Sequence, residues 1–162
     1  MKLELELIAR QEQDFANIAQ KLLSHLKLIC TNYNNNNCNA SYIELQGDLG
    51  AGKTTLVRYI LRELGYTGKV KSPTYNFLES YDIEKILNYS SVQHFDLYRF
   101  TDDNMWLEHG FDEYLNQNNL VFIEWASLAY NCLPKPMLKV NIAFGTNITT
   151  NIDDTSSRIV SW

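Results

Sequence analysis

The sequence has no long apolar run and few basic residues. No stretch approaches the roughly 20 apolar residues of a membrane-spanning helix, and the first residues lack the basic-then-apolar order of a signal peptide. Fourteen Lys and Arg residues against 19 Asp and Glu give a net charge of −5, and the basic residues do not cluster. We therefore expect a cytoplasmic protein that contacts no membrane and has no broad surface for nucleic acid.

Cysteine is scarce as well. Cys30, Cys38 and Cys132 are odd in number and include no C-x-x-C pair, which favours a reducing, intracellular compartment over a disulfide framework. A length of 162 residues suits one domain with a sizeable core, so we expect residues 1–162 to form a single domain. Within it, the asparagine-rich residues 31–40 hold too little apolar surface to order themselves and are predicted to be a connector.

A glycine-rich loop is the clearest functional motif. Residues 47–54 read Gly-Asp-Leu-Gly-Ala-Gly-Lys-Thr, the G-x-x-x-x-G-K-T phosphate-binding pattern. A short β-prone segment at 42–45 precedes it, and apolar residues at helical spacing follow it up to Gly65. Strand, glycine loop and helix predict an α/β fold of the P-loop NTPase kind, with a mostly parallel central sheet flanked by helices and a β-rich C-terminal part.

The residue types in this loop define its chemistry. Glycines lack Cβ, so the backbone can pass close to a phosphate while its N–H groups and the helix N-terminus face the anion. Lys53 supplies a positive charge for the terminal phosphates, and the Thr54 hydroxyl is a ligand for Mg²⁺. The predicted nucleotide-binding residues are Gly47, Asp48, Leu49, Gly50, Ala51, Gly52, Lys53, Thr54 and Thr55.

Two carboxylates are candidates for the second half of the site. Residues 120–123 form a continuous apolar run that ends in Glu124, as a buried strand delivering a carboxylate at its carboxyl end would. Residues 92–99 also suit a strand, which would carry Asp96 near its carboxyl end. We assign Glu124 to the metal beside Thr54, because its strand is the more apolar, and Asp96 to switching or to orienting the attacking water.

The remaining chain carries weaker signals. Ser72-Pro73-Thr74-Tyr75 would cross the γ-phosphate side of the nucleotide, although these four residues alone favour a plain turn. An acidic segment that follows has Trp106, Leu107, Phe111 and Leu115 as its apolar set. The other expected elements are an edge strand at 3–8, a helix at 11–29, a strand at 76–81, a hairpin or loop at 82–90, two short helices within 102–116 split at Gly110, and strands at 137–144, 147–152 and 157–162.

Four motifs in this order resemble those of one family. They are G-D-L-G-A-G-K-T-T at 47–55, S-P-T-Y at 72–75, H-F-D-L-Y-R at 94–99 and I-E-W at 123–125. The set resembles the bacterial TsaE (YjeE) ATPases, which act in forming N6-threonylcarbamoyladenosine in tRNA, and the resemblance covers about residues 1–145. It implies binding of ATP with Mg²⁺, slow hydrolysis by the protein alone, and action with a ligase subunit and its inactive homologue. Contact with tRNA would then be indirect.

Carried over residue by residue, the resemblance assigns roles to the matching positions. It places Lys53 and the loop on ATP, and Thr54 and Glu124 on the metal. It places Asp96 and Thr74 in two switch segments, which with Lys53 gives three catalytic residues. This chain departs from the family early in the first helix, where a threonine usually lies near the base. The best match is Phe15, so the contacts to the base are unassigned.

Two other functions share the loop. A small-molecule P-loop kinase needs cationic residues on a lid to hold the transferred phosphoryl group. In an ATP-gated protein-binding module, ATP sets the shape of the protein and hydrolysis is incidental. The arginines form no cluster that would favour the kinase; they are Arg10, Arg58, Arg62, Arg99 and Arg158. On an extended strand Arg99 faces away from Asp96, and Arg58 and Arg62 lie too far along the helix to reach back. We therefore expect a slow ATPase that its partners accelerate.

Overall fold

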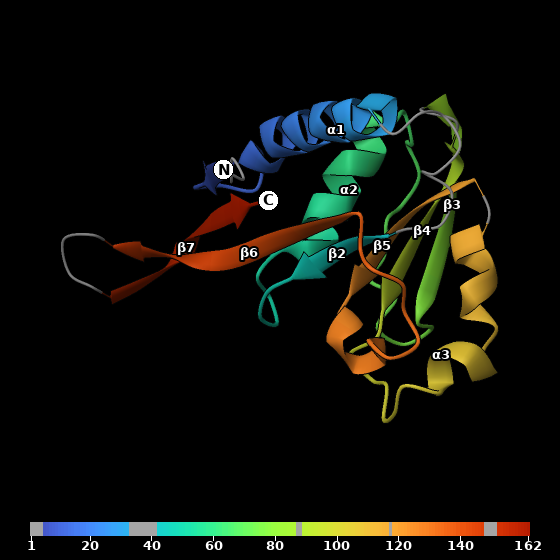
Figure 1. Cartoon of the computed structure of the whole chain (residues 1–162). Helices are drawn as coiled ribbons and strands as arrows, with labels where there is room; N and C mark the ends of the chain where they lie inside the picture. The colour runs from blue at the N-terminus through green and yellow to red at the C-terminus, as the bar shows by residue number, and fades with distance from the viewer. Residues whose placement is uncertain (1–4, 33–41, 87–88, 117, 148–151) are drawn as a thin grey trace.

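A computed structural model describes residues 5–32, 42–86, 89–116, 118–147 and 152–162 of the chain. Seven strands form one sheet, with helices on both of its faces (Figure 1). The elements are β1 (Glu6–Ala9), α1 (Asp14–Asn32), β2 (Ile43–Gln46), α2 (Lys53–Glu63), β3 (Leu78–Ile86), β4 (Tyr89–Asp96), α3 (Met105–Glu108), the 3₁₀ helix η2 (Phe111–Asn116), β5 (Asn119–Glu124), the 3₁₀ helix η3 (Ala126–Ala129), β6 (Leu138–Asn147) and β7 (Ile152–Ser161).

The sheet is parallel at its centre and antiparallel at both edges. Its order is β1-β7-β6-β2-β5-β4-β3, and the pairs β6–β2, β2–β5 and β5–β4 are parallel. The pairs β3–β4, β6–β7 and β1–β7 are antiparallel, so the described sheet as a whole is not mostly parallel. Parallel neighbours need a crossover of a dozen or so residues, whereas two residues separate β3 from β4 and four separate β6 from β7.

Two hydrophobic layers enclose the sheet. On one face α1 and α2 pack on the central strands, with Leu22 and Ile60 among the fully buried side chains. On the other face α3, η2 and η3 cover β4 and β5, where Trp106 packs against Phe95 with 5.0 Å between ring centroids. Figure 1 shows β6 and β7 projecting well beyond these layers. The alternation along β4 and β5 sends each side chain to a definite layer.

Several predicted boundaries are wrong. β3 begins at Leu78, two residues later than predicted, and continues to Ile86; of the two alternatives at 82–90, a hairpin or a loop, the antiparallel pairing of β3 with β4 confirms the hairpin. Of the strand predicted at 147–152, Asn147 is the last residue of β6 and Ile152 the first of β7, and residues 148–151 lie outside the described residues. Gly110, at φ +67°, separates α3 from η2 as predicted, but Leu107 is 52% exposed and lies outside the core.

The predicted connector lies largely outside the described residues. α1 ends at Asn32 and so takes in the first two residues of the segment 31–40, while residues 33–41 are not described. Cys30 and Cys132 are free thiols, and Cys38 falls in the undescribed segment. Neither α1 nor any other helix in the described part of the chain has the length and apolar composition of a membrane-spanning helix.

Candidate nucleotide-binding site

The glycine loop joins β2 to α2 in a conformation that only glycine adopts easily. Gly47 has φ +144°, and a Cβ there would lie 2.3 Å from the Ile142 carbonyl oxygen. Gly52 has φ +112° and directly precedes Lys53, the first residue of α2. A Cβ on Gly52 would lie 3.0 Å from the ring of Phe15. The loop is therefore held between β6 and α1, and the N-terminus of α2 opens onto the space above it.

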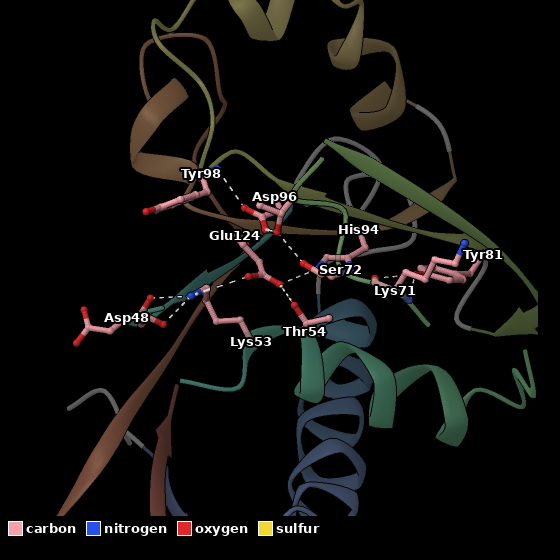
Figure 2. Close-up of polar contacts among 12 residues, drawn as sticks. Asp48, Lys53, Thr54, Lys71, Ser72, Tyr81, His94, Asp96, Tyr98 and Glu124 are labelled. Atoms are coloured by element: carbon pink, nitrogen blue, oxygen red, sulfur yellow. Dashed lines mark hydrogen bonds and ion pairs between the residues drawn. The ribbon is translucent and has the colours of Figure 1, made fainter. Parts of the chain in front are cut away.

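Lys53 is buried at the floor of the site. Its side chain is 4% exposed, and its ammonium donates to the carbonyl oxygens of Gly47, at 2.8 Å, and Asp48, at 2.9 Å (Figure 2). It also lies 4.5 Å from the ring centroid of Trp125, a cation–π contact. Burial lowers the pKa of Lys53, and the charges of Glu124, Asp96 and Asp48 oppose that shift. The amine is therefore a desolvated donor close to three acidic side chains.

Glu124 ends β5 and receives two hydrogen bonds on one oxygen. The Thr54 hydroxyl donates to its Oε1 at 2.8 Å, and Nε2 of His94 lies 2.8 Å from the same atom. The other oxygen, Oε2, lies 3.9 Å from the Lys53 ammonium. Thr54 comes from the first turn of α2 and His94 from β4, so three elements fix this carboxylate.

Asp96 ends β4 directly beside Glu124, with which it pairs in register. The Thr74 hydroxyl donates to Asp96 Oδ2, and the backbone N–H of Tyr98 donates to Oδ1 at 3.0 Å. The Phe77 carbonyl accepts from the Asp96 N–H at 3.0 Å. These bonds tie the loop at 72–77 to the end of β4, so the tetrapeptide Ser72–Tyr75 is part of the site and more than a plain turn.

A cavity of about 250 Å³ lies between these groups. Of the predicted site residues, nine line it: Leu49, Gly50, Gly52, Lys53, Thr54, Thr55, Thr74, Asp96 and Glu124. Gly47 and Asp48 instead line a second cavity on the other side of the loop, and Ala51 is fully buried. A volume below the roughly 300–1,000 Å³ of pockets that enclose a whole ligand suits the phosphate end of a nucleotide.

The donor set fits a Mg²⁺-bound phosphate. Thr54 donates its single hydroxyl proton to Glu124, which leaves its oxygen lone pairs to face a cation. Glu124 Oε2, Thr54 Oγ1 and phosphate oxygens are the hard oxygen ligands that Mg²⁺ prefers, with waters completing its shell. The described residues contain no group of three or more His, Cys, Asp or Glu that would enclose a metal alone, so a metal bound here would also need ligands from the phosphate.

One expectation about the surroundings is wrong. β4 ends at Asp96 instead of extending to Arg99, because the chain turns there and the Leu97 N–H donates to the Glu124 carbonyl at 3.1 Å. The exposed Arg99 then stacks on the Tyr75 ring, 4.3 Å from its centroid. Phe15, the position at which the base contacts were left unassigned, is 4% exposed and lies in the core beneath Gly52.

The two arginines on α2, Arg58 and Arg62, lie away from the cavity, as expected. Arg58 pairs with Glu12 at 3.2 Å, and Arg62 stacks on Tyr59 at 5.1 Å. Neither lines the cavity, and no arginine does so among the described residues.

Sequence reasoning missed three contacts of the site. His94 carried a usable signal, because strand alternation places it on the same face as Asp96. Trp125 has a left-handed backbone, φ +60°, and packs against the layer of α3, η2 and η3 while its ring also contacts Lys53. Arg158 donates from β7 to the Ala51 carbonyl at 2.9 Å, across 107 positions of sequence, and nothing in the sequence indicates that contact.

The fold and the site define a phosphate-loop α/β protein. A family model described as threonylcarbamoyl adenosine biosynthesis protein TsaE matches residues 9–152. The chain therefore belongs to the TsaE family, as its motifs indicated.

Individual relatives agree with this assignment. The chain is similar to the tRNA threonylcarbamoyladenosine biosynthesis protein TsaE of Haemophilus influenzae, with 42% identity over 105 residues, which are 65% of this chain and 64% of that protein. The Bacillus subtilis protein of the same name is 37% identical over 100 residues, 62% of this chain and 60% of that one. The crystal structure of Bacillus subtilis YdiB superposes with a TM-score of 0.66 and 25% identity, covering 99% of this chain and 85% of that chain.

Proposed function

We propose that this protein binds ATP with Mg²⁺, hydrolyses it slowly, and acts with protein partners in forming threonylcarbamoyladenosine in tRNA. The observation that carries the proposal is the convergence of Lys53, Thr54, Asp96 and Glu124 on one cavity from three separate elements, α2, β4 and β5. The names of the relatives support the pathway. The matched segments span less than two thirds of the Haemophilus influenzae and Bacillus subtilis TsaE proteins. The substrate and the partners of this chain are therefore part of the proposal.

Each residue has a distinct role in the proposed hydrolysis. The loop N–H groups and Lys53 hold the terminal phosphates, and bound Mg²⁺ neutralises charge on their oxygens. Thr54 and Glu124 hold the metal. Asp96 orients the attacking water, whose oxygen bonds to the γ-phosphorus as the bond to the β-phosphate oxygen breaks and ADP leaves. Thr74 holds Asp96 in place and connects the two switch segments.

Slow turnover follows from the charges around the cavity. An arginine at the transferred phosphate is worth about 10³ to 10⁵ in rate, yet Lys53 is the one Lys or Arg among the described residues that line this cavity. We infer that a protein partner supplies what is missing. The ligase subunit and its inactive homologue are the partners that the resemblance implies, with tRNA contacted through them. The cytoplasmic location stays a prediction from the sequence.

The small-molecule kinase is the second candidate, and the same observation disfavours it. A kinase has to clamp the phosphoryl group during transfer and to exclude water, for which it uses cationic lid residues. Arg99, the arginine of the switch segment that contains Asp96, is exposed and stacks on Tyr75. The product distinguishes the candidates, since free phosphate indicates an ATPase and a phosphorylated acceptor indicates a kinase. Partner binding that depends on ATP without either product indicates a binding module.

Steady-state phosphate release tests the proposal. We expect slow release by the protein alone, a change of about twofold or less in Arg99→Ala, and at least a tenfold rise, about 1.4 kcal/mol of barrier, when the ligase partners are added. Fast release by the protein alone that collapses in Arg99→Ala would show that Arg99 moves in to act as a cis finger, and would contradict the proposal.

A further inference from the structure

His94 is buried next to the site without being part of the cavity wall. Its side chain has 0% exposure, and it does not line the cavity that holds Asp96 and Glu124. Its Nε2 lies 2.8 Å from Glu124 Oε1, the same oxygen that accepts from Thr54 (Figure 2). It therefore has no route to a bound nucleotide except through Glu124.

The hydrogen bond fixes which way Glu124 faces. A carboxylate only accepts, so the proton of this bond belongs to His94 Nε2. With two donors converging on Oε1, rotation of the carboxyl group would break both bonds. Oε2 is left directed toward Lys53, 3.9 Å away, where the cavity lies. Without His94 a single hydroxyl would hold the carboxylate, and that hydroxyl belongs to a residue that is itself placed on the metal.

The other ring nitrogen argues against a packing role. His94 Nδ1 is buried and has no hydrogen-bond partner among the described residues. An unpaired buried polar atom destabilises the fold, and an apolar side chain at this position would avoid that cost. His94 lies between β3 and β5, in register with Glu79 and Phe122. Among the described residues, Glu124 is the one hydrogen-bond partner of its ring. The bond to Glu124 is what this side chain supplies.

We propose that His94 is a positioning residue that orients Glu124 so that Oε2 faces the Mg²⁺ of a bound nucleotide. This inference rests on the proposed binding of ATP with Mg²⁺. Residues that hydrogen-bond to metal ligands fix the orientation of those ligands, and their loss weakens metal affinity about 10- to 100-fold. His94 would therefore influence the metal and not the phosphates. Its replacement should lower the affinity for Mg²⁺ and leave the affinity for the nucleotide itself unchanged.

Calorimetric titration with ADP, in EDTA and in Mg²⁺, tests this on the whole chain. His94→Leu should leave the dissociation constant for ADP in EDTA within about twofold, and should weaken the apparent affinity for Mg²⁺ in the ADP complex about tenfold or more. His94→Gln is the matched variant, because its side-chain nitrogen reaches the position of Nε2 and still donates. It should retain Mg²⁺ affinity within about threefold. Mn²⁺ bound in the ADP complex, measured by electron paramagnetic resonance, gives a second readout that is independent of turnover.

Each result has a separate meaning. Equal weakening of ADP in EDTA and in Mg²⁺ would show a general structural role and overturn the inference, as would a Gln variant no better than the Leu variant. If the unaltered protein binds ADP equally well with and without Mg²⁺, the proposed function itself fails. Should the Leu variant not fold, as judged by its thermal transition, His94→Asn takes its place, because the shorter amide does not reach Glu124.

Discussion

Two buried carboxylates lie on neighbouring strands and point to opposite faces of the sheet. Glu44 of β2 is 2% exposed and Glu124 of β5 is 4% exposed. Each accepts from a hydroxyl, of Tyr130 and Thr54 respectively, and each has a lysine nearby. Glu124 lines the cavity beside Lys53, whereas Glu44 lines the cavity on the other side of the glycine loop. Burial and a basic neighbour therefore do not by themselves mark a functional carboxylate in this protein.

The difference lies in how closely a lysine approaches the second oxygen of each carboxylate. Glu44 accepts on Oε1 from Gln46, at 2.8 Å, and from Tyr130, and the Lys139 ammonium lies 3.1 Å from its Oε2. Burial raises the pKa of Glu44, but these three partners outweigh it and hold the pKa below its usual value. Lys139 is half-exposed, so its charge stays hydrated while it neutralises Glu44. The cluster stabilises the packing of β6 and the turn after η3 on β2.

Glu124 Oε2 has no partner as close as the one at Glu44 Oε2. Its lysine is buried, lies 3.9 Å away and donates to two loop carbonyls instead. A phosphate entering the cavity would offer Lys53 a stronger acceptor, and a metal would offer Glu124 Oε2 a partner. The comparison indicates that the carboxylate of the candidate site is the one whose second oxygen has no close basic partner. Four predictions test this difference.

The largest effect is expected at Asp96, which has no counterpart beside Glu44. Asp96→Asn keeps the shape of the side chain but removes the charge that orients water, so phosphate release should fall about 10²- to 10⁴-fold. Affinity for ATP should change less than about threefold, because Asp96 is not placed on the phosphates. Asp82→Asn, on the exposed part of β3, is the control. A variant that loses mainly Mg²⁺ affinity would show that Asp96 and Glu124 have exchanged roles.

The two lysines give the next largest difference. Lys53→Met should weaken ATP binding about 100-fold, equal to about 3 kcal/mol, because it removes the buried cation that faces the phosphates. Lys139→Met should leave ATP binding unchanged, since this lysine pairs with Glu44 on the other side of the sheet. Calorimetry with a non-hydrolysable ATP analogue measures both. Comparable losses in the two variants would mean that the charge acts at long range and that the two sides are not separate.

Much of the nucleotide cavity was predictable because its signals are local. The glycine loop, Lys53 and Thr54 follow one another in sequence, and Glu124 ends an apolar run whose burial is evident. The pairing of Asp96 with Glu124 followed from strands that end at one edge of a sheet. The Glu44 cluster gave no signal, because its partners Tyr130 and Lys139 lie 86 and 95 positions away and resemble ordinary surface residues.

The errors also have local causes. Arg99 was placed on a strand because the apolar alternation continues past Asp96, whereas the turn that follows depends on a bond to β5. The sheet was expected to be mostly parallel because the phosphate loop implies a parallel centre, which says nothing about the edges. Leu107 fits a helical period, but the helix it belongs to spans only Met105–Glu108, so the period does not fix its direction.

The third prediction compares the two glutamates directly. Glu124→Gln should weaken Mg²⁺ affinity in the nucleotide complex about 10- to 100-fold, since a neutral amide is a poorer metal ligand than a carboxylate. Glu44→Gln should leave it unchanged. Titration of Mg²⁺ into the protein saturated with ADP measures both values. An effect of Glu44→Gln on the metal would show that the strand transmits changes at Glu44 to the loop at Gly47, only three residues further on.

The smallest effect concerns stability and appears only at Glu44. Because the folded pKa of Glu44 lies below its ordinary value of 4.5, its contribution is fully present above about pH 5 and is lost as pH falls through the folded pKa. Glu44→Gln should therefore cost about 1.5 kcal/mol at pH 7, typical of a hydrogen bond to a charged group. That corresponds to a transition temperature lower by about 5 °C for a chain of this size.

The difference in stability between the unaltered protein and Glu44→Gln should narrow below pH 4.5, as protonation makes Glu44 resemble the amide. Thermal unfolding from pH 7 to pH 3 measures the gap, with Glu79→Gln, a half-exposed glutamate on β3, as the control. A difference in stability that stays constant with pH would mean that shape, and not charge, holds the Glu44 cluster together. The two carboxylates would then differ in more than the distance to their lysines.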